Sequence, residues 1–209
     1  MVRITGYVKA ALPGVAALSF VWGALYWWTL GFSAFSSYSH VALSAPSLPN
    51  RPPALVVTDQ SGGQLRLFEP TGSYRLLSFG YLSCTGTCPL TIADFQGFHQ
   101  SLVEQRLTNL QLFTITLAPH QDLPDALLFY WENLGSPKNW VFVTPGLVER
   151  EPYWESLRRM GMWVDRNELG QPVHDNRTFL LDPQGFLIHS FAGVPTLERV
   201  QAILAQEDK

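Results

Sequence analysis

The chain has 209 residues, two cysteines, 15% charged residues and a formal net charge of −3. It contains no run of lysines or arginines, which excludes a nucleic-acid-binding protein that works through a basic surface. The length allows one ordinary domain and an appendage.

The appendage is expected at the amino terminus. Arg3 and Lys9 are followed by an uncharged, largely apolar run over 10–35, long enough to cross a bilayer core of about 30 Å as a helix. We therefore predict a cytoplasmic segment at 1–9 and a transmembrane anchor at 10–35, because basic residues stay on the cytoplasmic side. A cleaved signal peptide is the alternative, but its apolar region would be shorter, about 7 to 15 residues. The rest of the chain is expected on the periplasmic or extracytoplasmic side of the inner membrane.

Residues 36–53 are rich in serine and proline and lack periodicity, which predicts a tether. The pattern becomes globular over 54–209. The predicted elements there are a hairpin over 54–68, a buried strand 74–81, a helix from the cysteines to about 106, a strand 110–117, a helix 122–134, a strand 139–144, a helix 147–162, an irregular stretch 163–176, a final hairpin of strands 177–182 and 186–193, and a helix from 196. This order predicts an α/β or α+β sandwich with a mixed sheet.

Both cysteines fall where the strand 74–81 gives way to a helix, at the edge where open α/β sheets usually place their sites. Pro89 suits the first turn of that helix, and a helix amino terminus makes a thiol more acidic. If the loop winds helically, the β-carbons of Cys84 and Cys88 lie about 5 to 6 Å apart, whereas a disulfide prefers about 3.8 Å. The spacing therefore favours a metal site without excluding a disulfide.

A third ligand is sought among the five histidines. His174 precedes a predicted strand and could reach the same sheet edge as the cysteines. The others have simpler interpretations: His40 is solvated in the tether, His99 lies about three turns along the helix, His120 is on a surface loop and His189 packs within a strand.

Three segments carry a resemblance to a known family. FGYLSCTGTCP, the strand TITLAP followed by D-x-P, and H-x7-DPQG resemble the Sco/SenC family over nearly the whole chain. The resemblance implies a thioredoxin-like fold and a copper protein that assists assembly of the copper A centre of cytochrome c oxidase. It places the copper ligands on Cys84, Cys88 and His174. We therefore expect a membrane-anchored copper metallochaperone rather than an enzyme, with a respiratory oxidase subunit as its partner.

The chain also departs from the family pattern. An acidic residue usually lies between the two cysteines, where this chain has Thr85, Gly86 and Thr87. The family usually has aspartate at the positions of Ala118 and Val173. These differences leave the three ligands in place and bear on partner docking and on the stability of the oxidised metal form.

Two alternatives remain open at this stage. One is a membrane-tethered thiol-disulfide oxidoreductase, in which Cys84 attacks and Cys88 resolves. The cis-proline of thioredoxin-like reductases, however, has no counterpart near Asn176 and Arg177. The other is an accessory subunit of a respiratory membrane complex that keeps the copper site as a relic.

Overall fold

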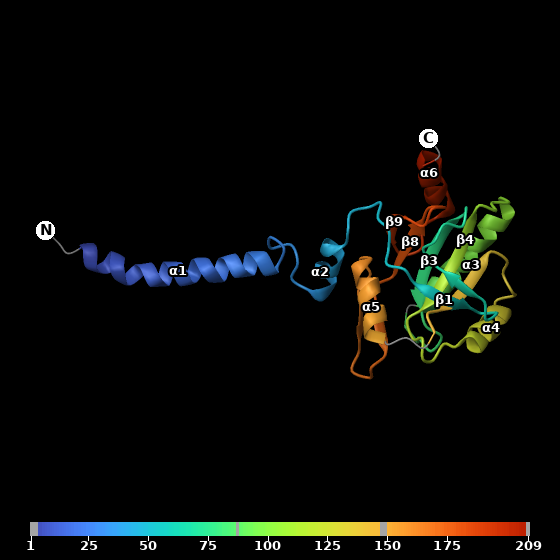
Figure 1. The fold of residues 1–209 in the computed structure, drawn as a ribbon, viewed down its shortest axis with the longest axis horizontal. Helices are drawn as coiled ribbons and strands as arrows, with labels where there is room; N and C mark the ends of the chain where they lie inside the picture. The colour runs from blue at the N-terminus through green and yellow to red at the C-terminus, as the bar shows by residue number, and fades with distance from the viewer. Residues whose placement is uncertain (1–3, 87, 147–149, 208–209) are drawn as a thin grey trace. The chain divides into compact units, whose positions relative to one another are not determined.

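The structure, a computed structural model, describes residues 4–86, 88–146 and 150–207 (Figure 1). The chain divides into two compact units, the first ending at Ala45 and the second beginning at Pro46. The first unit contains helices α1 (Ile4–Trp28) and α2 (Ser37–Ser44).

Helix α1 ends at Trp28, inside the apolar run. Leu30, Gly31 and Phe32 follow with positive φ angles of 49°, 74° and 62°, and the Phe32 ring lies 5.1 Å from that of Trp22. Within the part of the chain that the structure describes, no helix combines the length and the apolar character needed to cross a membrane. The transmembrane helix predicted at 10–35 is therefore not confirmed.

The segment predicted as a tether has structure of its own. The side chains and backbones of Ser36 and Ser39 form a capping box that starts helix α2. Further on, Asn50 exchanges two backbone hydrogen bonds with Leu187, at 3.1 and 2.8 Å, and so joins the edge of the main sheet. Neither feature follows from the serine and proline content of this segment.

Seven strands of the second unit form a mixed sheet in the order β2-β1-β5-β4-β3-β8-β9. Strands β3, β4 and β5 are parallel, and the remaining neighbours pair antiparallel. The strands are β1 (Val56–Asp59), β2 (Gln64–Arg66), β3 (Tyr74–Gly80), β4 (Leu110–Thr116), β5 (Trp140–Thr144), β8 (Arg177–Leu181) and β9 (Leu187–Ala192).

Strand β3 lies inside the sheet, with neighbours on both sides, and all seven of its residues are buried, as its continuous apolar run predicts. Its one charged residue, Arg75, donates hydrogen bonds to the carbonyls of Leu67 and Glu69. These bonds accommodate the guanidinium in the interior.

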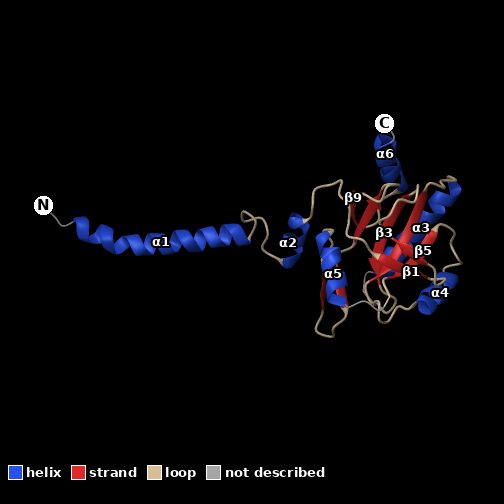
Figure 2. Ribbon diagram, viewed as in Figure 1, coloured by secondary structure: helices blue, strands red, loops and turns tan. Residues whose placement is uncertain are grey.

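Helices cover both faces of the sheet, which gives the expected α/β sandwich (Figure 2). Helix α5 (Arg150–Arg159) packs on one face through Tyr153, Trp154 and Leu157. The other face is covered by α3 (Cys88–Glu104), α4 (Pro124–Asn133) and α6 (Leu197–Glu207). Every predicted element of this unit has a counterpart, although residues 147–149 of the predicted helix 147–162 lie outside the described residues.

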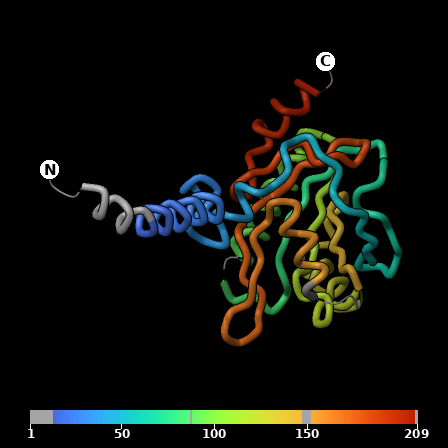
Figure 3. The backbone as a smooth tube through the Cα atoms, turned by 60° about the vertical axis from the view of Figure 1, so that its left-hand side comes forward, coloured from blue at the N-terminus to red at the C-terminus, as the bar shows by residue number. Residues whose placement is uncertain are grey.

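One prediction for this unit is wrong. The stretch 163–176, expected to be irregular, contains a hairpin of β6 (Val164–Arg166) and β7 (Pro172–His174), which form a separate two-stranded sheet. Figure 3 shows this hairpin, in orange, as a loop at the edge of the second unit. The side chain of Asn167 accepts backbone hydrogen bonds from Leu169 and Gln171 and so organises the turn. Strands of three residues are too short to show an alternating pattern.

Candidate metal centre

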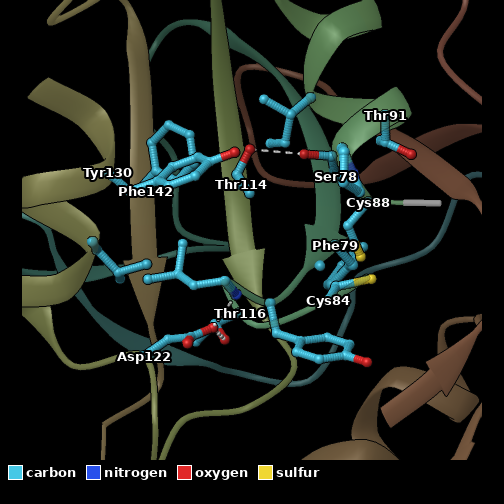
Figure 4. Close-up of a pocket in the computed structure, with 16 residues that line it drawn as sticks. Ser78, Phe79, Cys84, Cys88, Thr91, Thr114, Thr116, Asp122, Tyr130 and Phe142 are labelled. Carbon is cyan, nitrogen blue, oxygen red and sulfur yellow. Dashed lines mark hydrogen bonds between the residues drawn. The ribbon is translucent and has the colours of Figure 1, made fainter. Parts of the chain in front are cut away.

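The cysteine loop connects β3 to α3. Cys84 is half-buried, Cys88 is buried at the first position of α3, and both are free thiols. The Cys84 N–H donates to the Tyr81 carbonyl at 3.2 Å, which closes a turn. Figure 4 shows the two sulfur atoms side by side. The predicted position of both cysteines at the carboxyl end of a central strand is confirmed, while Thr87 lies outside the described residues.

The two thiols differ in acidity. Burial by itself raises the pKa of Cys84, but hydrogen bonds from the side chain and backbone of Cys88, the backbone of Gly86 and the side chain of Tyr81 outweigh it, so the pKa lies below its ordinary value. Burial raises the pKa of Cys88 to about 12, and its hydrogen bond to Cys84 adds to the increase. Cys84 is therefore the thiol that ionises first and the better nucleophile.

Strand β7 carries His174 to the cysteines. Its Nε2 lies 3.7 Å from the Sγ of Cys88, although the two residues are 86 positions apart in the chain. The Nδ1 of His174 lies 2.6 Å from the Asp175 carbonyl, which can only accept a hydrogen bond, so Nδ1 carries the proton. Burial lowers the pKa of His174 against the opposing effects of the Asp175 carbonyl and carboxylate. The neutral imidazole thus presents the Nε2 lone pair toward Cys88.

The distance between Cys88 Sγ and His174 Nε2 suits two ligand atoms bound to the same metal ion. Protein metal sites use sulfur and nitrogen distances of about 2.3 Å and 2.0–2.1 Å, which place the two donor atoms roughly 3.6–3.8 Å apart at an angle of about 110–120°. The observed distance between Cys88 Sγ and His174 Nε2 is 3.7 Å. However, no group of three or more histidine, cysteine, aspartate or glutamate side chains in the described ranges is arranged to hold a metal ion. The structure thus brings Cys84 to Cys88 and His174 to Cys88, without forming a complete three-donor group.

Asp122, in the loop between β4 and α4, supports the cysteine loop. Its Oδ2 accepts the backbone N–H of Leu82 at 3.0 Å and the hydroxyl of Thr116 at 2.5 Å. The carboxyl is buried, which raises its pKa, while these two hydrogen bonds lower it. Sequence reasoning did not assign a role to this residue, although the D-x-P motif that begins with it was the available signal.

A cavity of about 50 Å³ lies beneath the cysteines (Figure 4). Ser78, Thr114 and Asp122 contribute oxygen atoms to its wall, and the hydroxyls of Ser78 and Thr114 are hydrogen-bonded at 2.9 Å. The volume suits one or two water molecules and is far below the roughly 300–1,000 Å³ of typical small-molecule pockets. The cavity is therefore no place for an organic substrate.

The other four histidines lie apart from the cysteines. His40 and His120 are exposed, on α2 and in the loop after β4. His99 Nε2 donates to the Lys138 carbonyl at 2.6 Å, and the His189 ring lies 4.5 Å from the ring of Phe191. Each of these positions agrees with the non-ligand interpretation made from the sequence.

Comparison with known proteins finds similarity in sequence and in fold. The SCO1/SenC family profile matches residues 53–145, a stretch that contains both cysteines and ends before His174. A Stutzerimonas stutzeri protein provisionally named as copper-binding is 30% identical over 167 residues, which are 74% of this chain and 75% of that protein.

Solved structures extend the similarity to about three quarters of the chain. A SCO1/SenC family lipoprotein from Bacillus anthracis superposes with a TM-score of 0.68 at 20% identity, over 78% of this chain and 97% of its own. Copper-bound ScoI from Arabidopsis thaliana gives 0.62 at 14% identity, over 76% and 98%. BsSco, described as a member of the Sco family of cytochrome c oxidase assembly proteins, gives 0.60 at 19% identity, over 78% and 95%. These similarities confirm the thioredoxin-like fold expected from the sequence.

Proposed function

Because the chain belongs to the SCO1/SenC family, we propose that it carries copper on Cys84, Cys88 and His174 and delivers it to, or matures, the copper site of a respiratory haem-copper oxidase. The observation that carries the proposal is the 3.7 Å approach of His174 Nε2 to Cys88 Sγ. Relatives described as copper-binding, copper-bound or belonging to an oxidase assembly family support it.

The donor chemistry supports copper as the cargo. Cu(I) is a soft ion that thiolates and imidazole bind well, and two sulfurs with one nitrogen match that preference. Zinc would require a fourth ligand. The residues between the cysteines, Thr85, Gly86 and Thr87, offer no acidic side chain that could supply it. Binding would release the protons of both thiols, so affinity must fall as the pH falls. The greater exposure of Cys84 leaves one side of the site open to the donor atoms of a partner.

A copper titration tests the ligand assignment. The reduced full chain is titrated with Cu(I) against a competing chelator, beside His174→Ala, Cys88→Ser and the control His189→Ala, which removes a histidine from β9. We expect weaker binding in the first two variants and unchanged binding in the control. Wild-type affinity in His174→Ala would remove His174 from the ligand set. Failure of the wild type to bind copper would favour the accessory-subunit alternative.

The delivery role is tested in cells. Deletion of the gene in copper-limited cells should lower the copper content and the activity of the haem-copper oxidase. Full metallation of the oxidase in the deletion strain would refute delivery, even if the purified chain binds copper.

The unequal thiols favour a second candidate, a thiol-disulfide oxidoreductase. The pKa of Cys84 is lowered and that of Cys88 is raised, as an attacking and a resolving cysteine require. The Cys84 thiolate would attack a partner disulfide, form a mixed disulfide and release one partner thiolate. Cys88 would then attack the sulfur of Cys84 and release the second partner thiolate, leaving the partner as a dithiol and this chain as a Cys84–Cys88 disulfide. Turnover lost in Cys88→Ser and retained in His174→Ala would support this function.

We also propose that the first unit attaches the protein to a membrane, with the second unit on the extracytoplasmic side. The support is a group of exposed aromatic side chains on α1, of which Phe20, Trp27 and Trp28 are 78%, 81% and 70% exposed. Large exposed apolar surfaces of this kind need a covering partner. Fractionation of the full chain against a chain that begins at Pro46 tests attachment, and recovery of both in the soluble fraction would contradict it.

A further inference from the structure

A side-chain hydrogen bond joins the helix that carries Cys88 to the residues that follow His174. The hydroxyl of Thr91 donates to the Oδ1 of Asn176 at 2.9 Å, across 85 positions of sequence. Thr91 lies three residues after Cys88 on α3, so the two side chains share a face of the helix. Asn176 lies two residues after His174, beyond the end of β7.

The two partners are anchored differently. Thr91 is 5% exposed and is held by the packing of α3 against the sheet. The Asn176 carbonyl accepts the N–H of Gly193 at 2.5 Å, and the Gly193 carbonyl accepts the hydroxyl of Thr178 at 2.7 Å. Asn176 is therefore tied to the β8–β9 edge while its side chain reaches across to α3.

His174 itself depends on a small sheet for its position. Among the described residues, strand β7 pairs only with β6. The residue after His174 is held by hydrogen bonds from Asp175 N–H to the Trp163 carbonyl at 3.0 Å, from Trp163 N–H to Asp175 Oδ2 at 3.3 Å and from Arg177 Nε to Asp175 Oδ2 at 3.1 Å. These contacts tie Asp175 to Trp163, just before β6, and to the first residue of β8. They orient His174 within its hairpin. None of them involves α3, so the distance between His174 and α3 depends on other contacts.

We propose that Thr91 and Asn176 are positioning residues that set the separation between Cys88 and His174 for metal binding. The inference rests on the proposed function, since it assigns the pair a role at that site. Metal sites require their donors within about 0.5 Å of the productive geometry. The hydrogen bond lies close to the Cys88–His174 contact in both segments, so its loss lets the hairpin move relative to the helix.

The test uses Thr91→Val, which removes the hydroxyl at nearly constant shape, and Thr91→Ser, which keeps it. Asn176→Ala removes the same bond from the exposed partner and retains the backbone bond to Gly193. Cu(I) affinity of the full chain is measured by chelator competition, and thermal unfolding confirms that each variant is folded. We expect Thr91→Val and Asn176→Ala to bind about two- to tenfold more weakly, as the loss of one hydrogen bond predicts, and Thr91→Ser to bind like the wild type.

A double-mutant cycle separates positioning from general loosening. In the His174→Ala background, Thr91→Val should cause no further loss of affinity, because the imidazole that it positions is gone. Unchanged affinity in Thr91→Val, an equal loss in both backgrounds, or a Thr91→Ser variant as weak as Thr91→Val would overturn the inference while leaving the proposed function intact. Unchanged affinity in His174→Ala alone would overturn the inference and remove His174 from the proposed ligand set.

Discussion

Replacing Asp122 by alanine should lower the free energy of unfolding of the second unit. The loss comes from hydrogen bonds at the cysteine loop and not from hydrophobic contacts in the core. The carboxylate accepts two hydrogen bonds, from the Leu82 backbone and the Thr116 hydroxyl, at a buried position. The Leu82 N–H belongs to the loop that leads to Cys84. In Asp122→Ala this partly buried donor loses its acceptor, and an unsatisfied polar group away from water is costly.

The size of the effect follows from these two bonds. A hydrogen bond to a charged group contributes about 1.5–3 kcal/mol, so two contribute about 3–6 kcal/mol. Burial of the carboxylate offsets part of this gain, as the raised pKa of Asp122 indicates. We therefore expect Asp122→Ala to lower the free energy of unfolding by about 2–4 kcal/mol.

Urea unfolding measures this loss, with Asp94→Ala, an exposed aspartate on α3, as the matched control. A change below about 0.5 kcal/mol, the range of ordinary surface substitutions, would refute the reasoning. The pH dependence gives a second check. Because the pKa of Asp122 is raised in the folded state, its contribution to stability decreases as the pH rises from below 3.8 through the raised value. The loss in Asp122→Ala should therefore be larger at pH 4 than at pH 7.

Three further predictions concern the cysteines, the histidine and a turn. At pH 7–8, iodoacetamide should alkylate Cys84 before Cys88, because the pKa of Cys84 is lowered and that of Cys88 is raised to about 12; peptide mass mapping that finds Cys88 modified first would contradict this. The ratio of the copper affinities of wild type and His174→Ala should stay constant from pH 8 down to 6.5 and fall only below it, because the pKa of His174 is lowered; a fall that begins above pH 6.5 would count against it. Gly185→Ala should lower the free energy of unfolding by more than about 2 kcal/mol, because φ is +87° and the new Cβ would lie 2.2 Å from the Phe68 carbonyl oxygen. If the variant unfolds at the same temperature as the wild type, the prediction is wrong.

Long regular segments could be predicted from the sequence, and contacts between distant segments could not. Strand β3 and helix α3 were predictable because their apolar residues follow the periods of a buried strand and a helix. The cysteine positions follow from those two elements. The β6–β7 hairpin was missed because its strands have three residues each and polar ends. An apolar run also predicted one helix over 10–35, where backbone conformations at Leu30 and Phe32 end α1 early.

The supporting contacts of the site were beyond sequence reasoning for a different reason. Asp122 meets Leu82 across 40 positions, and Thr91 meets Asn176 across 85. Single polar residues carry no periodic signal, so only the folded chain pairs them. His174 could be predicted as a metal ligand because it precedes a strand. The 3.7 Å distance between its Nε2 and the Sγ of Cys88 depends on the β6–β7 hairpin, which the sequence did not predict.

Because of the separate two-stranded sheet, the proposed copper ligands are held by two different parts of the fold. Both thiols lie at the junction of β3 and α3, whereas the imidazole lies on β7, which pairs with no strand of the main sheet in the described residues. A receiving protein that displaced this hairpin would meet an ion still bound by sulfur, after overcoming the packing of Val164 in the core and its hydrogen bond from Arg158. In the proposed role, stepwise ligand substitution would then begin at the histidine and leave the main sheet folded.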